Sequence, residues 1–239
     1  MSEFTPALLG ALGALIAATV AQLMARNSAK NIAEKEWESK VYQEFIFPFL
    51  PKVILYYETE THFRKDDHVE KELSLKDLIS DISKEVRYGN MKLLSCFYEI
   101  EKNRHLIDFV GGIEQRNMLK FLFWYLDYAI SILEKMEPKE ESLIKEIKEI
   151  QKLYGAWIMV TDAFGFITSY NVISFMKQAH LFKDILLSDD INLIREYVEA
   201  DVGYDERRNV YLSRFVRAIE AKAGDDNLVF IKIFEEYIL

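Results

Sequence analysis

The sequence has few of the residues that make tight turns, disulfides or metal sites. Nine glycines and four prolines among 239 residues are too few for the many tight turns of an all-β sandwich or barrel. The single cysteine, Cys96, excludes an intramolecular disulfide framework and a thiolate zinc cluster, and it fits a reducing compartment. Since only four histidines are present, any imidazole-based site would have to use some of them.

Basic residues are also scarce relative to acidic ones. Thirty Lys and Arg against 39 Asp and Glu give a net charge of −9, which argues against nucleic acid as a partner. The sequence contains no phosphate-binding loop, dinucleotide fingerprint or nucleophile elbow, so P-loop, Rossmann and α/β-hydrolase chemistry have no support. We therefore expect no cofactor and favour a role other than catalysis.

What the sequence does contain is a long uncharged run at residues 6–25. Twenty residues make about 30 Å of helix, which matches the hydrocarbon core of a bilayer. The run therefore predicts a single transmembrane helix. A secretory signal peptide would need a basic stretch ahead of the run, where the one charged side chain is Glu3. A further alternative stays open, in which this alanine-rich helix is buried in a larger protein complex.

The basic residues nearest the run all follow it, at positions 26, 30, 35 and 40. The positive-inside rule then predicts an N-terminus outside and a C-terminal domain in the cytoplasm. A charge asymmetry this simple suits a bacterial inner membrane. We accordingly expect a single-pass membrane protein with the lipid bilayer as one partner and a cytosolic protein as another.

The run also carries small residues at four-residue spacing, which lets the backbones of two membrane helices approach closely. Two adjacent rows of this kind predict that the span associates with a second copy, so that the protein is a homo-oligomer. The six residues of the two rows are Gly10, Ala14 and Ala18, and Gly13, Ala17 and Ala21.

Beyond the run, apolar residues recur at helical spacing, and the fold class is predicted to be all-α. We predict an N-terminal transmembrane helix at residues 1–26, a helical stalk at residues 27–51 and an α-helical bundle domain at residues 52–239. Pro48 and Pro51 should break or kink the stalk because proline lacks an amide donor and clashes with the preceding turn. Residues 53–57 could form a strand by β-propensity, but the helical neighbours favour a helix.

Two long helices should form the centre of the bundle. Residues 113–136 are apolar nearly all round, and Lys120 and Asp127 make a core helix a better interpretation than a second membrane segment. In the next helix apolar residues alternate steps of four and three, which predicts packing as a coiled coil or, more simply, as an antiparallel hairpin with residues 113–136. Gly155 would permit close packing. The positions of this seam are 143, 147, 150, 154, 157, 161 and 164.

Three groups of residues are candidates for chemistry. Glu58, His62 and Asp66, with His68 nearby, have the spacing of a metal site on one helix side, but no second ligand cluster supports it, and we expect a polar helix end and no metal. Cys96 lies among apolar residues and should be a buried structural thiol. The third group could bind an anion, anionic lipid headgroups or an acidic partner, or could form a salt-bridged surface. It consists of Arg207, Arg208, Arg214 and Arg217.

The leading hypothesis is a membrane-anchored, non-enzymatic helical interaction protein, which acts as an oligomerising adaptor or as a membrane effector through its span. One alternative is a helical enzyme or ligand-binding domain tethered to the membrane. The other is a subunit of a larger complex that buries the N-terminal helix. No catalytic, cofactor-binding or metal residues are assigned from the sequence.

Overall fold

The computed structural model describes residues 4–62, 73–105, 112–167, 169–170, 173 and 191–199, without the side chains of residues 4–20, 112, 163, 164 and 193. Every regular element in these ranges is a helix, which confirms the all-α class. Contacts divide the chain into two compact units, Met1–Val41 and Tyr42–Leu239. The elements are α1 (Phe4–Val41), the π-helical turn η1 (Tyr42–Ile46), α2 (Phe47–Glu60), α4 (Leu75–Ser83), the 3-10 turn η2 (Val86–Tyr88), α5 (Met91–His105), α6 (Gly112–Leu133), α7 (Glu141–Phe164) and α10 (Ile191–Glu199).

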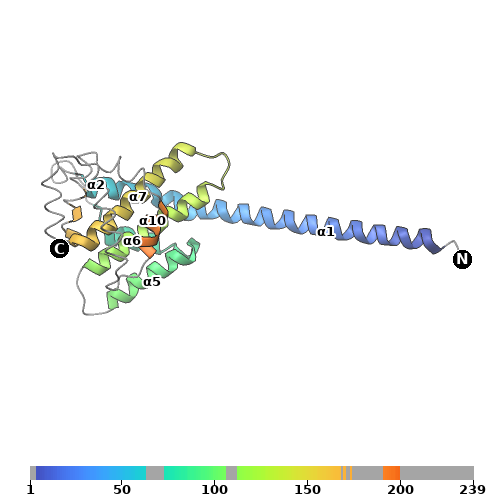
Figure 1. The fold of residues 1–239 in the computed structure, drawn as a ribbon, viewed down its shortest axis with the longest axis horizontal. Coiled ribbons are helices and arrows are strands. Elements are labelled where there is room, and N and C mark those ends of the chain that lie inside the picture. The colour runs from blue at the N-terminus through green and yellow to red at the C-terminus, as the bar shows by residue number, and fades with distance from the viewer. Residues whose placement is uncertain are drawn as a thin grey trace. The chain divides into compact units, whose positions relative to one another are not determined.

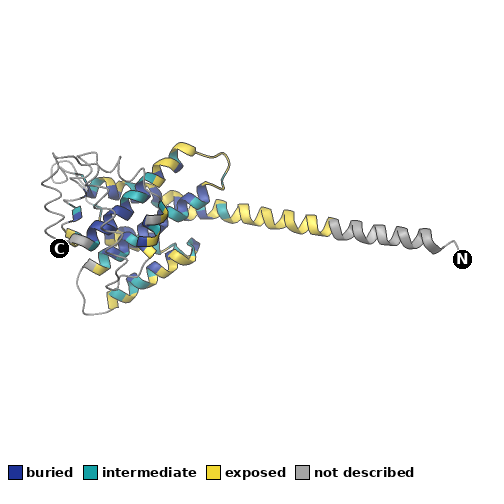
Figure 2. Ribbon diagram, viewed as in Figure 1, coloured by how far each residue is buried: buried dark blue, intermediate teal, exposed yellow. Residues whose placement is uncertain are grey.

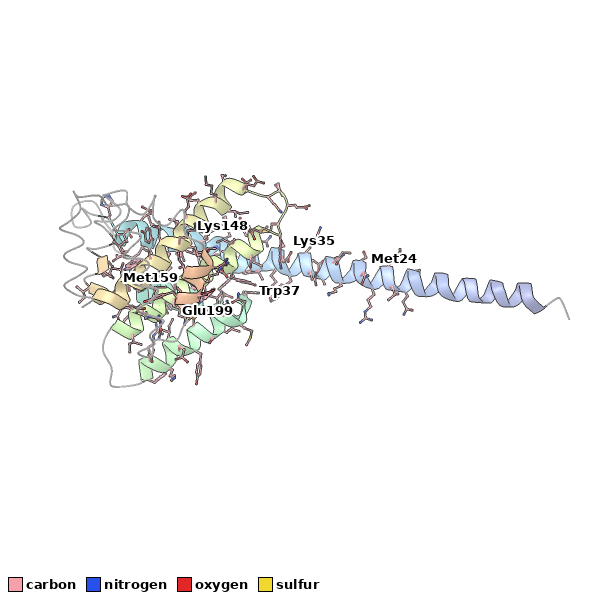
Figure 3. The ribbon with its side chains drawn as sticks, viewed as in Figure 1. Met24, Lys35, Trp37, Lys148, Met159 and Glu199 are labelled. Atoms are coloured by element: carbon pink, nitrogen blue, oxygen red, sulfur yellow. The ribbon has the colours of Figure 1, made fainter. Side chains whose placement is uncertain are left out.

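The first unit is one uninterrupted helix, α1, of 38 residues (Figure 1). From residue 21 to residue 40 its side chains are exposed on all sides, with Glu38 half-buried (Figure 2). Large apolar side chains among them, such as Met24 and Trp37 (Figure 3), do not gather on one face. A helix without an apolar stripe gains little from packing, and such helices commonly bridge solvent between other parts.

The predicted span at residues 6–25 lies within α1, but the side chains of residues 4–20 are not described. Among the residues whose side chains are described, no helix has the length and apolar character needed to cross a membrane. The transmembrane span therefore stays a prediction from the sequence. The predicted stalk, residues 27–51, extends across the division at Val41 between the two units.

The predicted interruption at Pro48 and Pro51 takes the form of a widened turn. η1 is π-helical, and α2 then continues through Pro51 as an α-helix. Proline has no amide hydrogen, so the carbonyl four residues before it lacks its α-helical donor; for Pro48 and Pro51 these are the carbonyls of Glu44 and Phe47. The buried hydroxyl of Tyr125, on α6, lies 2.9 Å from the carbonyl oxygen of Phe45 and 3.0 Å from that of Ile46, and its proton serves both. A side chain distant in sequence thus supplies a donor at the turn.

We expect Tyr125→Phe to lower the free energy of unfolding by about 1 to 2 kcal/mol, because two buried carbonyls would lose this donor while the ring keeps its packing. Urea unfolding of the purified full-length chain, followed by tryptophan fluorescence, measures the loss. Tyr98→Phe is the matched control, since Tyr98 is 67% exposed. Equal stability of the two variants would contradict this account of the turn.

Helices α6 and α7 form the centre of the second unit and lie side by side (Figure 1). As residue number rises along α7, the number of its partner on α6 falls, so the pair is antiparallel, as predicted. Both helices carry large buried side chains, which are Trp124 and Tyr125 on α6 and Tyr154 and Trp157 on α7. The burial of α6 confirms that it is a core helix. The polar contacts that give the direction are Lys148 to Glu134 at 2.6 Å, Gln151 to Asp127 at 2.9 Å, and Arg116 to Asp162 at 2.6 Å.

Aromatic rings join α2 to α7. The Trp157 ring is stacked on that of Tyr56 at a centroid distance of 5.9 Å and meets that of Tyr57 edge-on at 6.0 Å. Tyr154 donates from its hydroxyl to the carbonyl oxygen of Val53 at 2.7 Å. Such pairs add to the apolar area that these rings bury. Residues 53–57 belong to α2 and are helical, as the neighbouring elements indicated. Their contacts place them against the predicted seam of α7.

The short helix α10 packs on α7 at Gly155. A side chain at this position would overlap Cγ2 of Ile194, and it would lie 3.2 Å from the Phe123 ring. The close packing predicted for Gly155 is thus confirmed. Of the predicted bundle beyond residue 173, the structure describes only α10.

Capping residues set the starts of α4 and α5. The hydroxyl of Ser74 accepts a hydrogen bond from the amide of Asp77 at 3.3 Å and so caps α4. Asn90 accepts from the amide of Leu93 at 3.0 Å and so caps α5. α4 ends at Ser83, and η2 follows it.

Candidate functional site

The candidate functional site is an open groove of about 570 Å³ between α2 and the start of α7. We call it the α2 groove. Leu143 of α7 forms one wall, and η1 and α2 supply the rest. A volume of this size lies within the range of sites that bind small ligands or peptide side chains. Its eight lining residues are Tyr42, Phe47, Leu50, Pro51, Ile54, Leu55, Glu58 and Leu143.

The groove exists because α2 is apolar on two sides. Tyr56 and Tyr57 lie on one side and pack on α7. Phe47, Pro51 and Leu55 follow each other in steps of four residues and therefore share the other side. Phe47 is 64% exposed and Leu55 is 51% exposed. Single exposed apolar residues are ordinary, but a row of them along a groove is typical of a binding surface.

The chemistry of the lining is that of a contact surface. Glu58 is the one lining residue that carries a charge at neutral pH, and it is exposed. The other seven offer apolar area, together with the hydroxyl of Tyr42. These side chains contain no nucleophile beside a base and no pair of facing carboxylates, which are the arrangements that covalent or acid–base catalysis uses. The groove is suited to holding an apolar partner.

Two polar clusters lie elsewhere in the second unit, one buried and one partly exposed, and both attach α10 to the central hairpin. Arg116 and Asp162 form an ion pair at 2.6 Å with side chains 9% and 4% exposed, and the Tyr197 hydroxyl donates to Asp162 at 2.8 Å. In the other cluster, Arg195 contacts Asp127 at 2.6 Å. Because each cluster connects the three helices α6, α7 and α10, we assign both to the stability of the fold.

The predicted metal group is not assembled within the described residues. Glu58 lies exposed on α2, and His62 follows the end of that helix, while Asp66 and His68 lie outside the described residues. No group of three His, Cys, Asp or Glu side chains in the described ranges could hold a metal ion. The described residues thus place only Glu58 and His62 of this group, and the absence of a metal stays a prediction.

Cys96 is buried on α5, as predicted. Burial away from water raises the pKa of its thiol to about 11, since the thiolate would lose its hydration. At neutral pH the thiol is therefore protonated and is a poor nucleophile. The burial predicted for Cys96 is confirmed, and its structural role stays a prediction.

The remaining predicted sites fall mostly beyond what the structure describes. The backbone of all six small residues of the span belongs to α1, and Ala21 is exposed. The side chains at positions 14, 17 and 18 are not described. The four arginines at 207, 208, 214 and 217 lie outside the described residues. Self-association and anion binding thus stay predictions.

Sequence reasoning missed the α2 groove, although one signal was available. Phe47, Pro51 and Leu55 make an apolar row on a helix whose opposite side also carries Val53 and Tyr57. A helix with two apolar sides needs two partners, and one of them can come from another molecule.

Comparisons with known proteins do not identify a function. No family model matches the chain, and neither the curated proteins nor the solved structures gave a significant match.

Proposed function

We propose that this chain is a membrane-anchored, non-enzymatic helical interaction protein. Its N-terminal helix anchors it in the bilayer and associates with further copies, and its helical bundle binds a protein partner in the cytoplasm. The observation that carries the proposal is the α2 groove, an apolar surface on the bundle with half-exposed Phe47 and Leu55. Apolar rows of this kind mark interaction surfaces more often than catalytic centres.

The first unit supports the anchoring part of the proposal. α1 is a continuous helix of 38 residues that forms a compact unit by itself, and residues 6–25 of it are uncharged. Arg26, Lys30, Lys35 and Lys40 follow this run and are exposed, so the positive-inside rule places the bundle in the cytoplasm. Residues 26–41 then act as a spacer of about 24 Å between the bilayer and the bundle.

Self-association of the span is tested by adding bulk to the two small-residue rows. Gly10→Leu combined with Gly13→Leu should reduce the oligomer to a smaller species, because leucine side chains keep the two backbones apart. Light scattering of the purified chain in detergent gives the mass of the protein. Both substitutions keep the run apolar, so insertion into the membrane is retained.

Thr19→Leu is the matched control. A helix turns by about 100° per residue, which puts position 19 on the side opposite the two rows. This variant should keep the mass of the native oligomer. A native mass in the double glycine variant as well would contradict self-association through these rows.

A further inference from the structure

The surroundings of the α2 groove are acidic. Glu140 and Glu146 lie three residues before and after Leu143, and Glu44 lies three residues before Phe47; all three carboxylates are exposed. Residues three apart on an α-helix are neighbours, so Glu146 flanks Leu143, while Glu140 directly precedes α7 and Glu44 lies in η1, the turn that precedes Phe47. Glu58 adds a further charge within the lining.

Fewer basic than acidic residues lie at this spacing from the lining residues. Lys139 lies four residues before Leu143 and is exposed. Lys52 lies three residues before Leu55, and its ammonium lies 3.6 Å from a carboxylate oxygen of Asp81. The rim of the groove is therefore net negative, as is the whole chain at −9. An occupant with positive charge beside its apolar surface would be complementary to it.

The dimensions of the apolar lining fit a helix. From Phe47 to Leu55, α2 rises by eight residue steps, or about 12 Å along its axis. An amphipathic helix that docks through residues i, i+3 and i+7 places its anchors over about 10 Å. The lining is thus long enough for three anchor side chains from two turns of a partner helix.

We propose that the α2 groove binds a basic amphipathic helix of a protein partner. Its apolar side would pack between Leu55 on α2 and Leu143 on α7, and its cationic side chains would contact Glu140, Glu146 and Glu44. This inference rests on the proposed interaction function and names the chemistry of the partner. A membrane surface fits less well, because anionic headgroups would meet a rim of their own sign.

The test uses the full-length chain in nanodiscs of zwitterionic phosphatidylcholine and a fluorescent synthetic peptide. The peptide has the sequence of residues 205–223, in which Leu212, Phe215 and Ile219 are spaced as three anchors and four arginines provide the charge. Fluorescence anisotropy measures its binding. We expect saturable binding, and at least tenfold weaker binding of a peptide in which glutamate replaces the four arginines.

Two variants of the chain locate the binding. Leu55→Glu puts a carboxylate into the groove and should weaken binding at least tenfold. Met91→Glu is the matched control, because Met91 is 79% exposed on α5 and does not line the groove. It should bind as the native chain does. Equal binding by all three proteins, or no binding by any, would overturn the proposal.

One further outcome would assign the groove differently. In this outcome the peptide does not bind the native chain, but it does bind a variant in which the chain's own Arg207, Arg208, Arg214 and Arg217 are changed to Glu. That result would overturn an external partner and indicate that the same polypeptide fills the groove. Retention in nanodiscs reports on the anchor, and anisotropy reports on the groove. If the chain is not retained, the same titration in buffer still tests the groove, so the two proposals can fail separately.

Discussion

Replacing Asp162 with alanine is expected to cost about 3 to 5 kcal/mol of the free energy of unfolding. The Arg116 guanidinium would then be left in a buried position, with its side chain 9% exposed, without the carboxylate oxygen that lies 2.6 Å from its Nε atom. The Tyr197 hydroxyl would also lose its acceptor at 2.8 Å. A buried charge without its partner costs far more than the pair contributes when intact. Urea unfolding of the full-length chain measures the change.

Lys148→Ala is the control, because it breaks an ion pair of the same length in a different setting. Lys148 and Glu134 also lie 2.6 Å apart, but their side chains are 49% and 48% exposed. Water screens such a pair, so the expected loss is about 1 kcal/mol or less. Similar losses in the two variants would show that burial of Arg116 and Asp162 does not determine the cost.

Gly155→Ala should destabilise the protein by about 1 to 3 kcal/mol, although alanine stabilises an ordinary helix by about 1 kcal/mol relative to glycine. The sign reverses because the added methyl group would overlap Cγ2 of Ile194 on α10 and press on the Phe123 ring at 3.2 Å. Urea unfolding measures the variant, and a gain in stability would mean that α10 does not pack closely at this point.

A double variant shows whether the contact itself is the cause. Ile194→Ala alone should cost about 2 to 5 kcal/mol, since Ile194 is 2% exposed. Ile194→Ala also makes room for the new methyl group of Gly155→Ala. The double variant should therefore lose less stability than the sum of the two single losses, by about 0.5 kcal/mol or more. Strict additivity would indicate that residues 155 and 194 do not touch.

Features that depend on residues close together in the sequence were predictable from local patterns. The hydroxyl of Ser74 and the amide of Asp77 lie three residues apart, so their cap was predictable from the sequence alone. The apolar seam of α7, with Tyr154 and Trp157 fully buried, followed from its alternating steps of four and three residues. The glycine at 155 marked a close approach, although the sequence did not identify Ile194 as the residue that makes it.

Features that depend on distant residues were not predictable. Arg116 and Asp162 are 46 positions apart, and neither stands out in a chain in which 29% of the residues are charged. The prolines predicted an interruption, but not the hydrogen bond to the carbonyl of Phe45 from the hydroxyl of Tyr125, which is 80 positions away. The α2 groove was missed for the same reason, because tertiary packing decides which apolar side of α2 stays open.

The most direct test of the account is whether the chain is an integral membrane protein with its bundle in the cytoplasm. Bacterial membranes carrying the full-length chain are extracted with alkaline carbonate, and intact spheroplasts are treated with protease. The account predicts that the chain stays in the membrane pellet and that the bundle is cut only after the spheroplasts are lysed. Release of the chain into the carbonate supernatant would contradict the anchor at residues 6–25, and cleavage of the bundle in intact spheroplasts would contradict its orientation.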